Sequence, residues 1–279
     1  MPVALTIHLF AMCTPRSAFA RAFSILLAFL PLATGAAQAQ AQADSAALRF
    51  EAVPIEDEAE LWWARVPGDV NGDGVVDFIV QNNNGFGGWL AWYEAADSGR
   101  TWARHIIAET APNDSLFAAG DLDAGDIDGD GDIDALGIQQ AGEWEDADAP
   151  ALIYWYENTL ADGDSAWTSH FIGEVPDAVK DVNLVDLNAD SLLDLAVMTF
   201  EESTMSIFRQ DAPDDWALVQ KLTIENLHEG MDACDLDDDG DVDLAASGYW
   251  LDNPGGDLTG TWAVRSIDGW WHTQTGDWS

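Results

Sequence analysis

The chain has 279 residues, 48% of them hydrophobic, which is enough to bury a core in one or two domains. It carries 51 Asp and Glu against 10 Lys and Arg, and its net charge of −41 excludes nucleic acid and anionic membranes as expected partners, because both repel a surface of this sign. Disordered acidic chains are poor in aromatic residues, whereas this chain has 14 Trp and 11 Phe. The composition therefore favours a folded domain whose acidic loops are neutralised by metal ions.

Residues 1–43 are predicted to form a secretory signal peptide. Arg16 and Arg21 precede the apolar run FSILLAFLPLATG, and the small-residue tract after it offers cleavage behind Ala39, Ala41 or Ala43. A membrane anchor is the alternative, but the run is short for a bilayer span. Cleavage predicts a secreted, periplasmic or cell-surface protein consisting of residues 44–279. Two arginines and no acids leave with the signal, so the charge of the mature chain becomes −43.

The cysteines offer no disulfide framework for this secreted domain. Cys13 lies within the signal peptide, and Cys234 then remains alone. Something other than disulfides must therefore stabilise the fold.

An acidic stretch of nine residues occurs four times along the chain, roughly every 50 to 60 residues. The copies are DVNGDGVVD (69–77), DIDGDGDID (126–134), DLNADSLLD (186–194) and DLDDDGDVD (235–243). Each copy is followed by a short apolar run: FIV, ALGI, LAVM or LAA. In most copies an aromatic segment comes next: WLAWYEA, LIYWYEN or MSIFRQ. Every unit then has a segment that begins with Trp: WARHII, WTSHFI, WALVQKLTI or WAVRSI. Together with a strand before the acidic loop, as in LFAAGDLD, DVNLVD and GMDACD, each unit is predicted to contain four β-strands.

The spacing of oxygen-bearing side chains in these stretches is typical of a calcium loop. Side chains at positions 1, 3 and 5 and a carbonyl at position 7 can wrap a hard cation, with the acid at position 9 completing the set. The predicted side-chain ligands are Asp69, Asn71, Asp73 and Asp77; Asp126, Asp128, Asp130 and Asp134; Asp186, Asn188, Asp190 and Asp194; and Asp235, Asp237, Asp239 and Asp243. The predicted carbonyl ligands belong to Val75, Asp132, Leu192 and Asp241. Oxygen-only ligands favour Ca²⁺ over zinc or copper, so up to four calcium ions are expected, one in each loop.

Two alternatives to four equal calcium loops follow from the same residues. The stretches could be solvated acidic turns, but the repetition and the glycine at position 6 (Gly74, Gly131, Gly240) argue against that interpretation. In the third loop, Ala189 and Ser191 replace both glycines, which predicts a lower affinity there. An EF-hand would place an acid at position 12 on a helix, whereas position 12 is Val80, Gly137, Val197 or Ala246, followed by β-like sequence.

This pattern resembles the FG-GAP/VCBS repeat family, whose repeats carry a D-x-[DN]-G-D-G-x-x-D loop and often a W-Y-E-N-like strand. The resemblance covers about residues 47–279 and implies an all-β fold, a secreted β-propeller whose rings often have seven blades. Four repeats are visible here, preceded by LRFEAVPI, which is similar to the last strand of a blade. The fourth repeat is shorter than the first, and WWHTQTGD looks like the beginning of another blade. The chain is therefore expected to be a fragment or partial ring, with a closed four-bladed ring as the other interpretation.

Two functions are compatible with this fold, because fold alone does not decide function. The preferred one is a binding or interaction module for an extracellular glycan or protein. The alternative is a propeller-type polysaccharide lyase or related carbohydrate-active enzyme, since some lyases resemble this family. Lyase chemistry on a uronic acid needs a cation for the carboxylate and a base for the proton. Its weak candidate residues lie in or near the loops that lead into each unit: Arg65, Lys180, His228, His272 and Tyr249. No catalytic constellation is visible in the sequence, which favours binding without catalysis.

The remaining histidines and tryptophans are mostly repeat positions. His105 and His170 occupy the repeated W-x-x-H-x-I segment and are predicted to pack within the unit. Trp62, Trp63, Trp270 and Trp271 fall in the loops leading into units and could stack on sugar rings.

Overall fold

A computed structural model of the protein describes residues 51–56, 64–82, 88–112, 115–140, 150–161, 163, 166–200, 203–227 and 229–270. The chain divides into two units, Met1–Ala52 and Val53–Ser279, and every described strand belongs to the second. The predicted signal peptide lies outside the described residues.

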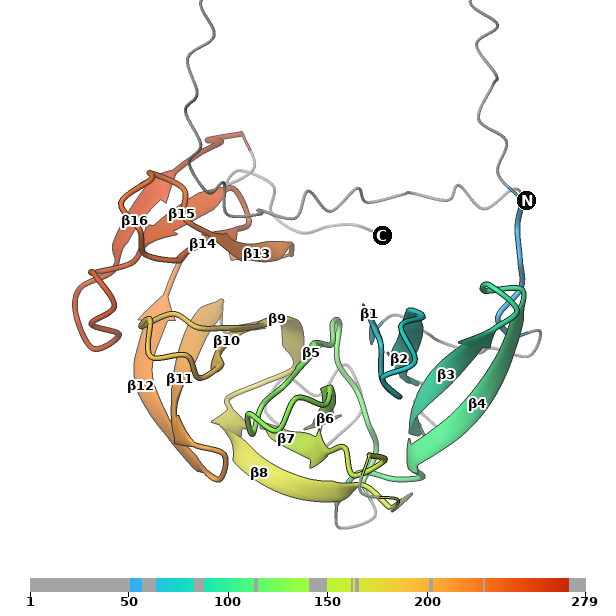
Figure 1. The fold of residues 1–279 in the computed structure, drawn as a ribbon. Helices are drawn as coiled ribbons and strands as arrows, with labels where there is room; N and C mark the ends of the chain where they lie inside the picture. Colours follow the sequence, from blue (N-terminus) through green and yellow to red (C-terminus); the bar gives the residue numbers. More distant parts are fainter. Residues whose placement is uncertain are drawn as a thin grey trace, which may run out of the picture. The chain divides into compact units, whose positions relative to one another are not determined.

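Four antiparallel sheets of four strands each make up the second unit (Figure 1). The first sheet contains β1 (Ala64–Gly68), β2 (Asp77–Gln81), β3 (Leu90–Ala96) and β4 (Thr101–Ala108). The second contains β5 (Ala124–Gly125), β6 (Asp134–Gln140), β7 (Ala151–Glu157) and β8 (Thr168–Val175). The third contains β9 (Val179–Val185), β10 (Asp194–Thr199), β11 (Thr204–Ala212) and β12 (Asp215–Thr223). The fourth contains β13 (Met231–Cys234), β14 (Asp243–Ala246), β15 (Tyr249–Asp252) and β16 (Ala263–Ser266).

Within each sheet the strands lie in chain order, so every connection is a simple antiparallel reversal. Each acidic stretch is the connection between the first and second strands. Its ninth residue opens the second strand and pairs with the last residue of the first strand: Asp77 with Gly68, Asp134 with Gly125, Asp194 with Val185, and Asp243 with Cys234. The strands predicted in DVNLVD and GMDACD are confirmed as β9 and β13, whereas β5 has only two residues and follows LFAAGDLD instead of lying within it.

The two middle strands of each sheet are the most buried, which explains their near-continuous apolar sequence. All six residues of β10 are buried, whereas the fourth strand of the same sheet, β12, is exposed or half-buried along its length. A strand covered on both faces has no solvent side to carry polar residues. The apolar runs after the acidic loops therefore form the core of the protein.

The alternating side chains of β10 connect the third sheet to its two neighbours. Leu195 and Val197 belong to a core cluster shared with the first two sheets, and Ala196 and Met198 belong to a second cluster shared with the fourth sheet. Packing between sheets is close: a Cβ built on Gly173 of β8 would lie 2.4 Å from the Phe208 ring of β11. Successive sheets thus share a continuous core along their faces.

The all-β prediction is confirmed, and the described residues contain no α-helix. No helix in this part of the chain is long and apolar enough to span a bilayer. The four residues at loop position 12 all lie in strands β2, β6, β10 and β14, which confirms that the loops are not EF-hands. The fourth sheet is shortened, as its sequence predicts, with four residues in each strand, yet it keeps all four strands.

Candidate metal-binding loops

The four acidic loops share one hydrogen-bond scheme, which begins with the carboxylate at position 1. In the first loop, Asp69 accepts the backbone N–H groups of Asp73 (3.0 Å) and Gly74 (2.8 Å). Asp186 and Asp235 accept the corresponding N–H groups of their loops, and Asp126 accepts those of Gly129 and Gly131. These bonds curl the loop around its first carboxylate.

The side chains at positions 3 and 5 continue the turn. In the second loop, Asp128 Oδ1 accepts the N–H of Asp130 (3.1 Å), and Asp130 Oδ1 accepts the N–H of Asp132 (2.9 Å). The first and third loops use Asn71 and Asn188 at position 3 in the same manner. Each of these side chains accepts one hydrogen bond from the backbone. A carboxylate can accept about four, so lone pairs on its oxygens remain available to a cation.

The aspartate at position 9 is buried and holds the loop to the third strand of its sheet. Asp134 is 1% exposed, and its two oxygens accept the N–H groups of Ile127 (2.9 Å) and Asn158 (2.8 Å). The same pair of bonds recurs at Asp77, Asp194 and Asp243. This residue type was predicted only as a ligand; the structure gives it a second role as a structural clamp.

Burial raises the pKa of the position-9 carboxyls of Asp77, Asp134 and Asp194. The pKa of Asp134 rises to about 7 and that of Asp194 to about 6, in both cases mainly through loss of solvent and despite two backbone hydrogen bonds. The neighbouring acids raise them further, Asp128 and Asp130 at the second loop and Asp190 and Asp186 at the third. A bound cation would oppose this shift by favouring the ionised form.

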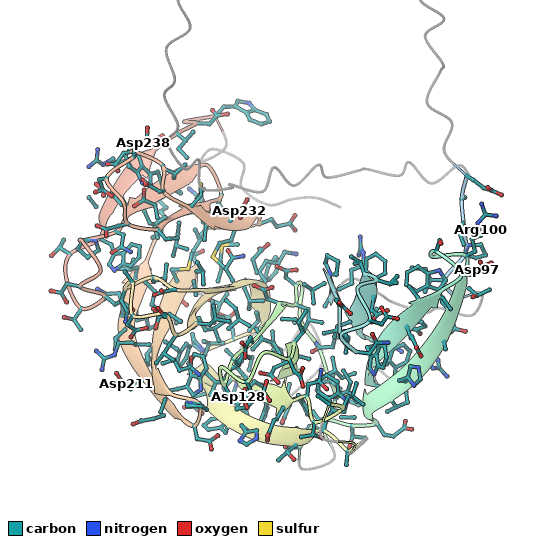
Figure 2. The ribbon with its side chains drawn as sticks, in the orientation of Figure 1. Asp97, Arg100, Asp128, Asp211, Asp232 and Asp238 are labelled. Atoms are coloured by element: carbon teal, nitrogen blue, oxygen red, sulfur yellow. The ribbon has the colours of Figure 1, made fainter. Side chains whose placement is uncertain are left out.

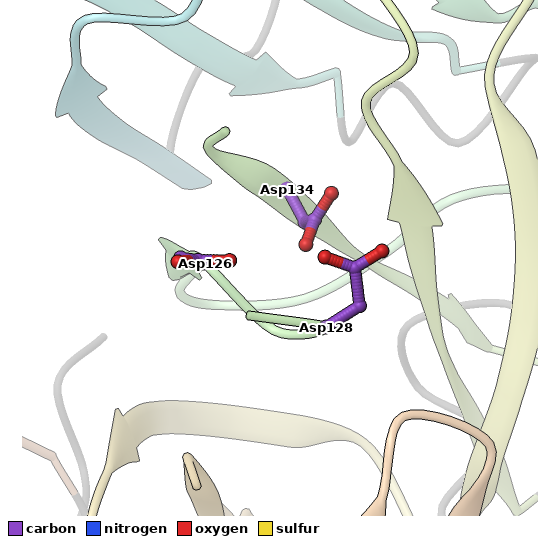
Figure 3. Close-up of side chains that lie close together, drawn as sticks. All are labelled: Asp126, Asp128 and Asp134. Carbon is purple, nitrogen blue, oxygen red and sulfur yellow. The ribbon is translucent and has the colours of Figure 1, made fainter. Parts of the chain in front are cut away.

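Two loops gather three carboxylates closely enough to surround one ion. Oxygens of Asp126, Asp128 and Asp134 lie within 4.8 Å of one another, and Figure 3 shows the carboxylates of Asp128 and Asp134 facing each other with Asp126 beside them. The second group is Asp235, Asp237 and Asp239. This set of carboxylate oxygens fits a hard cation such as Ca²⁺.

The third loop adopts the same backbone conformation without glycine. Ala189 and Ser191 have φ of 61° and 74°, where the second loop has Gly129 and Gly131 at 81° and 100°. The hydrogen bonds of the third loop are the same as those of the first loop. The third loop therefore forms, with backbone strain at two residues.

Replacing Ser191 by glycine should relieve part of that strain. The left-handed conformation costs a non-glycine residue about 1–2 kcal/mol, which a glycine at this position avoids. Glycine also increases the conformational entropy of the unfolded chain, and this offsets part of the stabilisation. We expect Ser191→Gly to raise the free energy of unfolding in urea by about 0.5–1 kcal/mol. Gly74→Ala is the matched control, because a Cβ at Gly74 (φ 84°) meets nothing within 4 Å and adds strain alone. The reasoning is wrong if Gly74→Ala is neutral or Ser191→Gly destabilises.

A second group of acids, which the sequence pattern did not single out, lies just before the first strand of the second sheet (Asp121 and Asp123) and within the first strand of the third sheet (Asp181). Asp123 accepts the N–H groups of Ala124 (2.9 Å) and Leu184 (2.7 Å), and Asp181 accepts the N–H of Gly230 (3.2 Å). Burial raises the pKa of Asp123 to about 6 and that of Asp181 to about 7. Asp121 adds to both shifts. Their bonds join neighbouring sheets, which the spacing along the chain does not reveal.

These pKa shifts predict that stability declines as the pH rises. An acid whose pKa is raised by folding favours the fold when protonated; that contribution is complete below the unfolded value of 3.8 and is lost as the pH rises through about 7. In saturating calcium, we expect the free energy of unfolding to fall between pH 5 and pH 8, and Asp181→Asn to flatten this slope. Glu229 opposes and Lys180 favours ionisation of Asp181, and both remain in the variant. Asp97→Asn, at an exposed turn (Figure 2), should leave the slope unchanged.

The residues predicted as weak catalytic candidates are placed only in part. His228 and His272 lie outside the described residues, as do Trp62, Trp63 and Trp271. Lys180 Nζ contacts Glu229 (2.7 Å) and lies 5.2 Å from the Phe200 ring, and the Tyr249 hydroxyl donates to the Glu225 carbonyl (2.8 Å). Arg65, on β1, contributes a favourable charge interaction at Asp121. The ammonium of Lys180 is thus already paired with a carboxylate.

The two repeated histidines pack against tryptophan, as predicted. His105 stacks on Trp92 (4.4 Å between ring centroids), and His170 stacks on Trp155 (4.2 Å). The tryptophans lie on third strands and the histidines on the neighbouring fourth strands. These rings belong to the packing of the sheets.

The described part of the chain contains surface hollows, two of which lie beside residues described above. One, of about 340 Å³, is lined by Glu229, Gly230, Ser247, Gly248 and Asp268. The other, of about 370 Å³, lies between the first two sheets and is lined by Trp92, Arg104, His105, Ile106, Leu160 and Trp167. The second combines aromatic and cationic groups on an otherwise acidic chain.

The chain is similar to known proteins only at the level of distant structural likeness. No protein-family model matches the chain, and no curated protein matches it. Among solved structures, the chain is similar to the V. cholerae biofilm matrix protein Bap1, with a TM-score of 0.44 and 16% sequence identity. The match covers 74% of this chain and 32% of that one, so the chain spans about a third of the length of Bap1.

Proposed function

We propose that this chain is an extracellular repeat protein of the FG-GAP/VCBS type, stabilised by calcium, that binds a glycan or a protein. In this proposal the four sheets are blades of a β-propeller and each acidic loop holds one calcium ion. The observation that carries it is the common hydrogen-bond scheme of the four loops, each placed between the first and second strands of its sheet. A scheme kept in four separate copies supports one shared role for the four loops.

The loop residues divide into two roles under this proposal. The side chains at positions 1, 3 and 5 and the carbonyl at position 7 would hold the ion, and the position-9 aspartate would support the loop while offering a lone pair to the ion. In this proposal calcium neutralises the charge of the loop and takes no part in a chemical reaction. Its absence would leave the acids of the second and fourth loops repelling one another across 4.8 Å or less.

Binding is favoured over catalysis by the state of Lys180, one of the two cationic candidates. A lyase needs a free cation for the substrate carboxylate, whereas Lys180 is paired with Glu229. Binding a sugar needs only an exposed aromatic face and nearby polar groups. Trp270, 63% exposed, offers such a face in the described part of the chain.

Metal counting and ligand binding together test this proposal. The purified chain, passed over a metal-free resin and re-equilibrated with calcium, should retain up to four ions by mass spectrometry. The calcium-loaded protein should bind members of a panel of immobilised neutral and acidic polysaccharides, and Trp270→Ala should weaken that binding. Absence of bound calcium would refute the loop assignment. Formation of unsaturated product from uronic-acid polysaccharides, followed by ultraviolet absorbance, would instead make the lyase the better reading.

A further inference from the structure

A buried carboxamide follows the third strand of the second and fourth sheets, and one lies within the third strand of the third. These residues are Asn158, Gln210 and Asn253, with exposures of 1%, 0% and 3%. The backbone N–H of each donates to the position-9 aspartate of its own sheet, at 2.8, 3.0 and 2.8 Å. Each carboxamide residue is therefore attached to the acidic loop of its own sheet.

The side chain of each carboxamide reaches the loop of the preceding sheet. Asn158 Nδ2 donates to the Val70 carbonyl (2.8 Å), Gln210 Nε2 to the Ile127 carbonyl (2.9 Å), and Asn253 Nδ2 to the Leu187 carbonyl (2.8 Å). Val70, Ile127 and Leu187 all occupy position 2 of their loops. One residue thus contacts two successive loops at the same two points in each case.

The orientation of the asparagine amides follows from their partners. Asn158 Nδ2 also donates to the Ile133 carbonyl (3.0 Å), at position 8 of its own loop, and Oδ1 accepts the N–H of Leu160 (3.1 Å). Asn253 repeats this arrangement with the Val242 carbonyl and the N–H of Gly256. A flipped amide would place oxygen against two carbonyls, so only the observed orientation satisfies the network.

The first sheet shows that the carboxamide is not needed to build a loop. Its equivalent residue is Ala95, whose N–H donates to Asp77 at 2.7 Å while the first loop keeps the common scheme. The first loop follows no earlier loop among the four. The carboxamide is therefore present where a preceding loop exists to be contacted.

From this geometry we propose that Asn158, Gln210 and Asn253 are positioning residues that couple cation binding between neighbouring loops. The inference rests on the proposed calcium loops. Position 2 lies between the ligand positions 1 and 3, so fixing its carbonyl fixes the backbone that carries two ligands. An ion that orders one loop also holds the carboxamide attached to its position-9 aspartate, and that carboxamide then orders the preceding loop. Coupling of this kind is reciprocal, so order passes in both directions.

Hydrogen exchange followed by mass spectrometry can read each loop separately in the full chain. The measured quantity is the calcium concentration at the midpoint of amide protection for residues 69–77, the first loop. Asp128→Ala removes a predicted ligand from the second loop only. We expect it to raise the midpoint of the first loop about fivefold or more. In an Asn158→Ala background, the same substitution should leave that midpoint unchanged.

Alanine is a suitable replacement for Asn158, because the first sheet has Ala95 at the equivalent position and keeps the backbone hydrogen bond to its position-9 aspartate. Gln139→Ala is the matched control: it removes a buried carboxamide of the same sheet, bonded to Ser115 (2.8 Å), that contacts neither loop. This control should keep the full fivefold shift. Gln210→Ala provides a second test between the second and third loops, read at residues 186–194, should Asn158→Ala fail to fold.

Three outcomes are distinguishable. A midpoint shift that disappears only with the carboxamide supports the coupling. An equal shift in both backgrounds, or no shift in either, overturns it while leaving calcium binding intact. Absence of calcium-dependent protection in every loop overturns the proposed calcium loops and the coupling together.

Discussion

Removing the proposed calcium ions with a chelator is expected to lower the melting temperature of the protein by on the order of 20 °C. A ligand present at 100 times its dissociation constant stabilises the fold by about 2.7 kcal/mol for each site, and a domain of this size shifts by about 2–4 °C per kcal/mol. Four occupied loops would therefore add several times the stabilisation free energy of an ordinary surface interaction. Calcium should restore the melting temperature at lower concentration than magnesium, because these irregular loops do not demand octahedral geometry.

The control for this experiment is ionic strength. A chain with a net charge of −41 is stabilised by any added cation through screening, which potassium chloride at matched ionic strength reproduces. Differential scanning calorimetry in excess chelator, in matched potassium chloride, in magnesium and in calcium separates screening from site binding. A melting curve that chelator leaves unchanged, or that potassium restores as well as calcium, would show that the loops are solvated acidic turns.

The strands and the position of each loop could be predicted because they depend on local sequence. Alternating apolar residues mark strands, and the spaced acids and glycines mark the turns between them. The stacking of His105 and His170 followed from their repeated place beside tryptophan. Repetition supplied the information that a single unit lacks.

Contacts between distant residues could not be predicted from spacing. Asp134 was predicted as a ligand, but its clamp to Asn158 joins residues 24 positions apart, and the bond from Asn158 to Val70 spans 88. The asparagine of WYEN is visible in the sequence, yet nothing local states that it contacts the preceding loop. Ala189 shows that local sequence preference can also be overridden. The hydrogen bonds of its loop hold it in a left-handed conformation that an alanine side chain disfavours.

The aspartates at positions 9 and 3 of one loop should respond differently to substitution. Asp134→Ala leaves the N–H groups of Ile127 and Asn158 buried without an acceptor, and each such group costs about 1–3 kcal/mol. Removing a buried carboxyl whose pKa is raised to about 7 returns part of that cost. We expect a net loss of about 3 kcal/mol in the free energy of unfolding in chelator, and calcium should enlarge this loss less than it enlarges the loss at position 3, because most of it comes from the backbone N–H groups.

Asp128→Ala should destabilise the protein only when calcium is present. Asp128 accepts one backbone N–H in an exposed turn, so its loss in chelator should stay within about 1 kcal/mol. In saturating calcium the same substitution should remove a proposed ligand and with it a stabilisation of about 2–3 kcal/mol. Urea unfolding of both variants under both conditions gives the four values, and Asp134→Asn, which keeps one oxygen, should fall between Asp134→Ala and the unmodified chain. Equal dependence on calcium in the two alanine variants would mean that the position-9 aspartate acts mainly as a ligand, and the division of each loop into clamp and ligands would then be wrong.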